Sequence, residues 1–289
     1  MSNGRAASVH ARLLARARER GEDFNLLLTR YGLERFLYRL SVSDARDRFW
    51  LKGALLFGLW FDAPHRPTRD ADFLGFGEAD AAVVAQTIAG VCAIEADDAM
   101  VYDPGSIRVE EIREGAHYSG LRVSLIGLLN RARCPVQLDI GYGDSVVPGP
   151  VDTELPVLLE GMPAPRLRTY PRASVMSEKF EAIVTLGIGN TRMKDYFDLR
   201  ALALEGRVDD EELAKAIAGT FGRRRTVVPD AVPIGLTDEF AADRTKQAQW
   251  NAFLARNRLE ATPLADVVRE IREFMERPIR LARVLKAMP

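Results

Sequence analysis

Cysteine is scarce in this sequence, which has two, Cys92 and Cys134, among 289 residues. Both lie among apolar residues, and their spacing matches neither a disulfide framework nor a zinc-binding motif. Long apolar runs are also missing, because no stretch approaches the ~20 residues that a helix needs to span a bilayer. The N-terminus is rich in arginine but lacks the apolar region of a secretory signal. These absences argue against a disulfide-stapled or membrane-spanning protein and predict a cytoplasmic one.

An excess of either charge is missing as well, since the formal net charge is −1. This balance argues against nucleic-acid binding over the whole surface, although it leaves room for a local basic patch. Hydrophobic residues make up 47% of the chain and charged residues 28%, which is typical of a globular protein. The length suffices for one large domain or two ordinary ones.

The periodicity of apolar residues changes along the chain. Apolar spacing of three and four predicts early helices, and alternation predicts strands between them. The expected helices are 6–20, 22–41 and 79–93, and the expected strands include 49–51, 107–112 and 121–126. Residues 145–168 hold five prolines and favour a connecting stretch.

Helical patterns alone follow that stretch, at approximately 171–187, 193–205, 209–221, 237–257 and 263–286. A strand-rich half followed by an all-helical half indicates an α+β protein with a mixed sheet. We expect two domains, 1–165 and 166–289, with a cleft between them.

The stretch from Trp50 to Gly77 carries the first candidate site. It predicts a short strand, a tight turn at Lys52-Gly53-Ala54, an apolar helix over 55–61, and a strand with Asp70 and Asp72. Residues two apart on a strand share a face, so the two carboxylates lie side by side. They repel each other, and a divalent cation such as Mg²⁺ would keep both ionised. Taken alone, the pair is more often just a polar strand end.

Two further segments supply candidate partners. A strand from Pro135 brings Asp139 near its end, and Asp144 follows after two glycines. Either acid suits a third-acid position, and an exposed acid on a strand is an equally good interpretation of Asp139.

In the helical half, Lys179 is followed by a polar helix start that holds Arg192, Lys194, Asp195 and Asp198. These cations suit a triphosphate, while a solvated face with an i, i+4 pair between Lys194 and Asp198 is the plainer interpretation.

Four segments in this order resemble the AbiEii/AbiGii nucleotidyltransferase toxins, which are related to the MenT toxins. That family lies within the DNA polymerase β-like nucleotidyltransferase superfamily. The segments are LKGALLFGLW…RPTRDADFL, QLDIGYGD, MSEKFEAIVTLG and RMKDYFDL, and with ERFLYRLSVS ahead of them they cover most of residues 30–200. Gly53-Ala54 departs from the Gly-Gly or Gly-Ser of many relatives, which removes one possible hydroxyl contact to phosphate.

The resemblance implies transfer of a nucleoside monophosphate (NMP) from an NTP to an acceptor. It implies a catalytic set of Asp70, Asp72, Asp139, Lys179 and Asp195, of which the first three would bind one or two Mg²⁺ ions. It implies NTP binding by Lys52, Gly53, Ala54, Arg66, Thr68, Lys179, Arg192 and Lys194. Asp139 is favoured over Asp144 because the family's acid lies within the apolar run.

The resemblance also implies the 3′ end of tRNA as acceptor, and a role as the toxin of a type IV-like toxin–antitoxin system with an AbiEi-like antitoxin. Arg223-Arg224-Arg225 and the arginines of the last helix offer a cationic track, although glutamates interleave with those of the last helix. The alternatives are NMP transfer to a small molecule or a protein, and a non-catalytic partner-binding protein.

Overall fold

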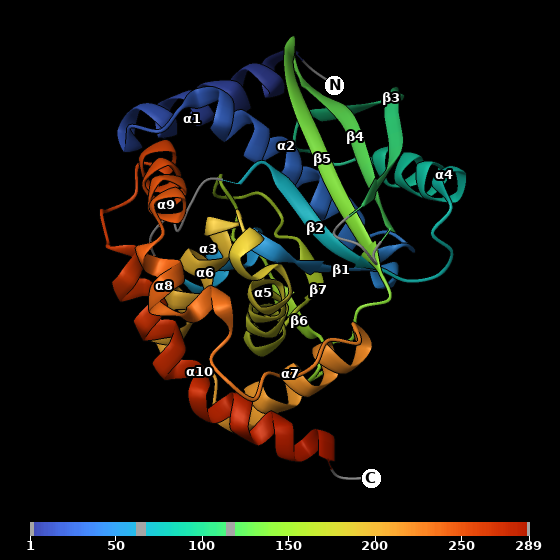
Figure 1. The fold of residues 1–289 in the computed structure, drawn as a ribbon. Helices are drawn as coiled ribbons and strands as arrows, with labels where there is room; N and C mark the ends of the chain where they lie inside the picture. The colour runs from blue at the N-terminus through green and yellow to red at the C-terminus, as the bar shows by residue number, and fades with distance from the viewer. Residues whose placement is uncertain (1–2, 62–67, 114–118, 288–289) are drawn as a thin grey trace. The chain divides into compact units, whose positions relative to one another are not determined.

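A mixed sheet of seven strands organises the first part of the fold (Figure 1). The computed structural model describes residues 3–61, 68–113 and 119–287. The strands are β1 (Phe49–Lys52), β2 (Asp70–Gly75), β3 (Met100–Arg113), β4 (Ser119–Leu129), β5 (Ala132–Tyr142), β6 (Val151–Glu154) and β7 (Arg166–Thr169). Their order is β3-β4-β5-β2-β1-β7-β6, with β2–β5 and β1–β7 parallel and the other pairs antiparallel. The predicted α+β class is confirmed.

The chain divides into two compact units. The first contains the chain up to Gly143 together with Val151–Thr169, so it holds all seven strands. The second contains Asp144–Pro150 and the chain from Tyr170 onward. This division differs from a single cut between residues 165 and 166, because β7 pairs with β1 and β6 inside the first unit.

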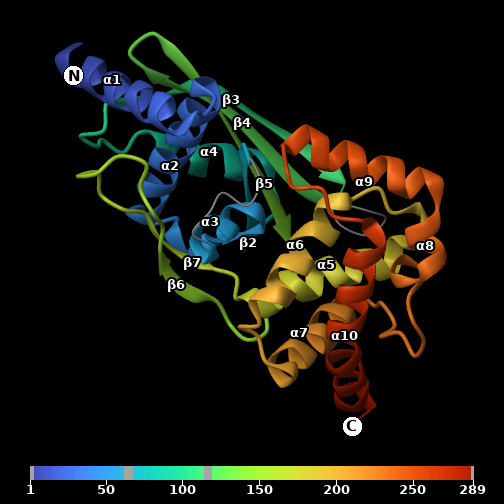
Figure 2. The same ribbon diagram turned by 90° about the vertical axis from the view of Figure 1, so that its left-hand side faces the viewer.

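Helices accompany the sheet in the first unit. They are α1 (Asn3–Arg20), α2 (Phe24–Ser41), α3 (Phe57–Trp60) and α4 (Ala81–Cys92). Helix α2 packs on β5 and β7, and α4 packs on α2 and β3 (Figure 2). Close packing is clearest at Gly32, where an added Cβ would lie 2.9 Å from the Cβ of Cys134. The even-numbered residues of β5 therefore face α2, and the odd-numbered ones face away from it.

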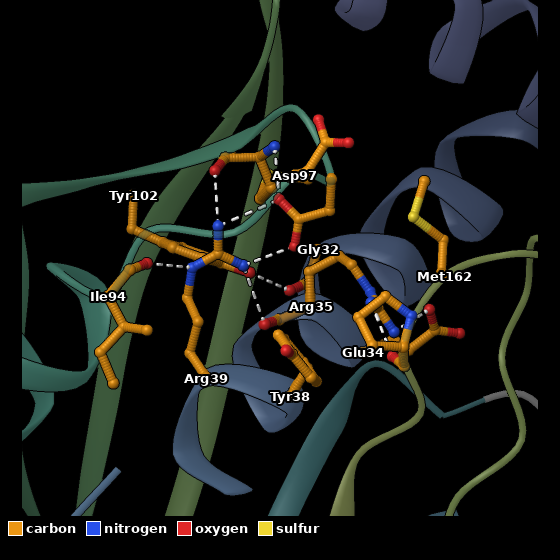
Figure 3. A network of polar contacts seen from close by, with 12 residues as sticks. Gly32, Glu34, Arg35, Tyr38, Arg39, Ile94, Asp97, Tyr102 and Met162 are labelled. Atoms are coloured by element: carbon orange, nitrogen blue, oxygen red, sulfur yellow. Dashed lines mark hydrogen bonds and ion pairs between the residues drawn. The ribbon is translucent and has the colours of Figure 1, made fainter. Parts of the chain in front are cut away.

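A buried arginine ties α2 to the segment that leads into β3 (Figure 3). Arg39 donates to both carboxylate oxygens of Asp98 at 2.6 and 3.0 Å, and to the carbonyls of Ile94, Arg35 and Met100. Both side chains are at most 2% exposed. Because every N–H of the guanidinium has an acceptor, the buried charge is compensated.

The second unit is built mainly from α-helices. They are α5 (Arg172–Leu186), α6 (Met193–Glu205), α7 (Asp210–Arg223), α8 (Asp238–Ala242), α9 (Arg244–Asn257) and α10 (Leu264–Ala287). Helix α5 packs on α6 and α7, and α10 packs on α6, α7 and α8 (Figure 2). The segment Asp144–Pro150 joins this unit, since the Val147 carbonyl accepts a hydrogen bond from Ser174.

Three expectations about the elements are wrong in detail. The helix expected over 55–61 is a 3₁₀ turn, Gly53–Leu56, followed by one turn of α-helix in α3. The helix expected over 237–257 is interrupted at Asp243, whose extended main chain ends α8 and whose side chain caps α9 through Lys246 N. The proline-rich stretch 145–168 contains β6 and the start of β7.

Among the residues that the structure describes, no helix is both long and apolar enough to cross a membrane.

Candidate active site

Asp70 and Asp72 lie on the face of the sheet that points away from α2. Ala71, between them, is buried on the other face, as strand alternation requires. In the neighbouring parallel strand, Gln137 stands opposite Asp70 and Asp139 stands opposite Asp72. The three acids therefore share one face, as the sequence predicts for Asp70 and Asp72.

Gly53 begins the turn after β1 and lies directly against Asp72. Its φ is +75°, and an ideal Cβ at this position would lie 2.0 Å from Oδ2 of Asp72. Lys52 of β1 is the strand partner of Asp72, and Ala54 continues the 3₁₀ turn. Glycine is thus required twice, by the positive φ and by the close approach of main chain to carboxylate.

Thr68 orients Asp70 from the loop that precedes β2. Its hydroxyl donates to Asp70 Oδ1 at 2.7 Å. Thr68 was expected among the NTP-binding residues, and this contact gives it a defined neighbour. Arg66, expected to bind phosphate, lies outside the described residues.

Asp139 is held by an arginine that is absent from the residues predicted from sequence. Arg122 of β4 donates through Nε to Oδ1 at 2.8 Å and through Nη2 to Oδ2 at 2.7 Å. Gln137 Nε2 lies 3.4 Å from the same Oδ1. Alternation within residues 121–126 places Arg122 away from the core. However, only the pairing of β4 with β5 reveals which acid it meets.

The second unit brings Lys179, Arg192 and two carboxylates together. Lys179 Nζ lies 3.0 Å from Asp195 Oδ1 and 2.7 Å from Asp198 Oδ2, and Arg192 Nε lies 2.7 Å from Asp195 Oδ2. The side chains of Asp195 and Asp198 are at most 1% exposed, and that of Lys179 is 11% exposed. The plainer interpretation, a solvated helix face, is therefore wrong for Asp195 and Asp198, whereas Arg192 is exposed.

Neighbouring positive charges, rather than burial, determine the direction in which the pKa of Asp195 is shifted. Burial alone would raise its pKa, but Lys179 and then Arg192 outweigh that effect, so the pKa of Asp195 lies below its usual value. The carboxylate is consequently ionised at neutral pH and fixes Lys179 in place. Lys194, the remaining cation of this segment, is exposed.

Asp144, the other candidate for the third acid, belongs to the second unit. It accepts from Arg224, whose guanidinium also pairs with Glu178 and Glu181. Burial alone would lower the pKa of Arg224, but Glu178 and Asp144 outweigh it and the pKa is raised. Arg224 is 18% exposed in its side chain and engaged by acids, which removes it from the cationic track expected at residues 223–225.

Three arginines of α10 are also paired with acids. Arg269 pairs with Asp266 in the same helix, whereas Arg272 pairs with Asp238 of α8 and Arg277 with Asp210 of α7. These pairs reduce the positive charge that α10 offers to a nucleic acid.

The described residues fit a divalent cation at Asp70 and Asp72, while the expected role of Asp139 as a third ligand stays a prediction. Two carboxylates with hard oxygen ligands on one face, next to a turn that begins with Gly53, suit Mg²⁺. Both oxygens of Asp139 already accept from Arg122. Within residues 3–61, 68–113 and 119–287, no group of three or more histidine, cysteine, aspartate or glutamate side chains is arranged to hold a metal ion.

Comparison with known proteins gives the family. The model of the AbiEii family, described as nucleotidyl transferase toxins of type IV toxin–antitoxin systems, matches residues 35–277. The chain belongs to the AbiEii family. It is therefore a nucleotidyltransferase, and the resemblance drawn from the four sequence motifs is confirmed.

Two solved structures are similar to this AbiEii-family chain. One is JHP933 from Helicobacter pylori, with 15% identity and a TM-score of 0.46 over 88% of this chain and 91% of that one. The other is an H. pylori chain described as a candidate nucleotidyltransferase, with 15% identity and a TM-score of 0.44 over 88% of this chain and 94% of that one. No curated protein shows significant similarity to the chain.

Proposed function

We propose that this protein transfers NMP from an NTP to the 3′ end of tRNA, with Mg²⁺, in the cytoplasm. Family membership supports a role as the toxin of a type IV toxin–antitoxin pair, so we also propose an AbiEi-like antitoxin as its partner. The observation that carries the catalytic proposal is the placement of Asp70 and Asp72 on one sheet face against the Gly53 turn.

Asp70 and Asp72 hold the metal ion in this proposal. When bound, Mg²⁺ supplies charge stabilisation for the triphosphate and for the developing pyrophosphate. Thr68 keeps Asp70 oriented through its 2.7 Å hydrogen bond. The Gly53 turn lets main-chain N–H groups of Gly53 and Ala54 approach phosphate oxygens, which a side chain at residue 53 would prevent.

Lys179 is the principal side-chain donor to the NTP in the second unit. Asp195 and Asp198 fix its ammonium group, so the donor needs little reorganisation during the reaction. Asp195 acts as a positioning residue for Lys179 and Arg192. Arg192 and Lys194 add positive charge for the phosphates.

The reaction breaks one phosphoanhydride bond and forms one phosphodiester bond. The acceptor hydroxyl oxygen attacks the α-phosphorus, the bond between that phosphorus and the bridging oxygen breaks, and pyrophosphate leaves with the electron pair. The hydroxyl proton passes to solvent or to a nearby carboxylate. No redox change is involved.

The first test identifies which part of the NTP is transferred. Purified protein is incubated with total RNA and each NTP in turn, labelled either at the α- or at the γ-phosphate. We expect α-label, and no γ-label, to enter tRNA. Asp70→Asn should lower incorporation by at least about 10²-fold, because the variant loses a metal ligand.

The same incubation distinguishes the acceptors. Label in protein or in a small molecule, with none in tRNA, would replace the tRNA proposal by NMP transfer to that acceptor. Absence of α-label in every fraction under all NTPs would contradict catalysis altogether and favour a partner-binding role.

A further inference from the structure

Arg122 occupies the centre of a charged row that crosses the sheet. In register, Glu110 of β3 stands opposite Arg122 of β4, Arg122 opposite Asp139 of β5, and Asp139 opposite Asp72 of β2. The guanidinium meets Asp139 in a bidentate fork at 2.8 and 2.7 Å. Each oxygen of Asp139 thus already accepts a charge-assisted hydrogen bond, the strongest class in proteins.

Arg122 also interacts with the first acid of the pair. Its pKa is raised mainly by the hydrogen bond to Asp139, and the negative charge of Asp70 and Glu110 adds to that effect. A guanidinium stays charged at any physiological pH. Asp70 therefore has a permanent positive charge within electrostatic range, in addition to any ion that it binds.

From this geometry we propose that Arg122 holds Asp139 outside the metal's ligand set and takes the place of a second divalent ion. The inference rests on the proposed function, in that it assumes a metal ion at Asp70 and Asp72. A cation bound by Asp139 would share its oxygens with the two hydrogen bonds from Arg122, which weakens the contact of each oxygen with the ion. Binding there would also bring the ion close to a like charge. Both effects favour a single ion bound by Asp70 and Asp72.

Arg122 accordingly acts as a positioning residue for Asp139 and as a fixed cation beside Asp70. This differs from the expectation, based on the family resemblance, that Asp139 is the third metal ligand. It also gives a reason why Arg122 of β4 stands directly opposite Asp139 of β5.

Metal affinity tests the proposal without relying on turnover. Mn²⁺ alone is titrated into the full chain and bound ion is followed by electron paramagnetic resonance. The variants are Asp70→Asn, Asp139→Asn, Arg122→Gln and the double variant Arg122→Gln/Asp139→Asn. The matched control is Arg108→Gln, on the same face in β3, where the side chain donates to the carbonyls of Gly105 and Ile107.

The proposal predicts strong coupling between the two substitutions. Asp139→Asn in the wild-type background should change Mn²⁺ affinity by less than about threefold, whereas Asp70→Asn should weaken it at least about tenfold. Arg122→Gln should tighten binding several-fold, because it removes a like charge and frees a carboxylate. Adding Asp139→Asn to Arg122→Gln should then reverse that gain, and Arg108→Gln should change nothing.

Two results are decisive against it. If Asp139→Asn weakens Mn²⁺ binding as much as Asp70→Asn does, Asp139 is a metal ligand and the inference fails, while the proposed function stands. If Asp70→Asn leaves both Mn²⁺ affinity and NMP transfer unchanged, the proposed function fails and the inference fails with it. Circular dichroism of each variant at the titration temperature excludes unfolding as the cause.

Discussion

At the residue scale, the main-chain conformation of Gly53 decides how closely the turn after β1 approaches Asp72. A side chain there is opposed by the positive φ and by the Asp72 carboxylate 2.0 Å from its Cβ. We expect Gly53→Ala to displace that carboxylate and to lower NMP transfer by about 10²-fold, as misplacement of a catalytic group by about 1 Å does.

Gly58→Ala is the matched control for this substitution. Gly58 lies in α3, and an added Cβ would have no neighbour within 4 Å. The Gly58→Ala variant should retain both NMP transfer and Mn²⁺ affinity. Equal loss of activity in the two variants would show that the turn itself is not the sensitive feature.

Lys179 has a structural role besides the role in NTP binding that we propose for it. Lys179→Met leaves Asp198 and one oxygen of Asp195 without the ammonium group that they contact. Removing one partner of a buried ion pair costs about 3–5 kcal/mol, so the free energy of unfolding should fall by roughly that amount. Urea denaturation measures it, with Lys194→Met, at an exposed position, as a control that should change by less than about 0.5 kcal/mol.

A second substitution separates this effect from simple loss of packing. Adding Asp198→Asn to Lys179→Met removes the buried negative charge that lost the Lys179 ammonium group, and part of the lost stability should return. The effect of Asp198→Asn is measured both in the wild type and in Lys179→Met. If it lowers the free energy of unfolding equally in both, the two side chains are not coupled.

The sequence predicts residues on a shared face better than it predicts their partners. Alternation alone puts Asp70 and Asp72 together, because period 2 is local information. The contacts of Asp139 with Arg122 and of Asp144 with Arg224 span seventeen and eighty positions, and they depend on strand pairing and helix packing. The site roles of all the candidate residues stay predictions, namely those of Lys52, Gly53, Ala54, Arg66, Thr68, Asp70, Asp72, Asp139, Lys179, Arg192, Lys194 and Asp195.

At the scale of elements, α5 is anchored to the end of α7 through Glu181. Its carboxylate accepts from Thr226 at 2.6 Å, Thr185 at 2.7 Å and Arg224 at 2.8 Å. Burial alone would raise the pKa of Glu181, but these hydrogen bonds outweigh it, so its pKa lies below 4.5. The unfolded chain therefore binds the proton more readily than the folded one.

The sign of this difference fixes the pH dependence of stability. Glu181 stabilises the fold above pH 4.5, and this contribution is lost as the pH falls through its lowered folded-state pKa. We expect the free energy of unfolding to fall more steeply with acid in the wild type than in Glu181→Gln. Below pH 4.5 the slopes of unfolding free energy against pH should differ between the two proteins by at most about 1.4 kcal/mol per pH unit, which corresponds to one proton. Parallel slopes in urea titrations would contradict it.

Long helices and strands could be predicted from sequence, as could the short strand β1, whereas β6, β7 and the break between α8 and α9 could not. Helices α2, α5 and α6 carry enough periodic residues for their patterns to fix them. Strands β6 and β7 have four residues each, in a proline-rich stretch, and gain their identity from pairing with each other and with β1. The break between α8 and α9 rests on the cap at Asp243, which a helical pattern continues through.

At the scale of the whole molecule, the second unit includes a segment that precedes it in the chain. Asp144 pairs with Arg224, and an added Cβ at Gly219 of α7 would lie 3.1 Å from Val147. A fragment of residues 170–289 should therefore be less stable than one of 144–289, by at least about 2 kcal/mol, because it loses a buried ion pair and the packing of Val147.

The fluorescence of Trp250 is a suitable probe of unfolding in both fragments. Trp250 is buried in α9, and the other two tryptophans lie in the first unit. Urea unfolding of both fragments, followed by its fluorescence, gives the two free energies. A third fragment, 144–289 with Asp144→Asn, isolates the ion pair. Equal stability of the two fragments would show that Asp144–Pro150 contributes nothing to the second unit.

This shared segment also sets an order of events during synthesis on the ribosome. The first unit has all of its sequence once Thr169 has emerged, whereas Asp144–Pro150 waits for α5 and α7. At translation rates of 5–20 residues per second, the rest of the chain needs on the order of ten seconds. Under the proposed function, which places Lys179 in the NTP site, the nascent chain gains activity only after α5 and α6 have emerged and folded.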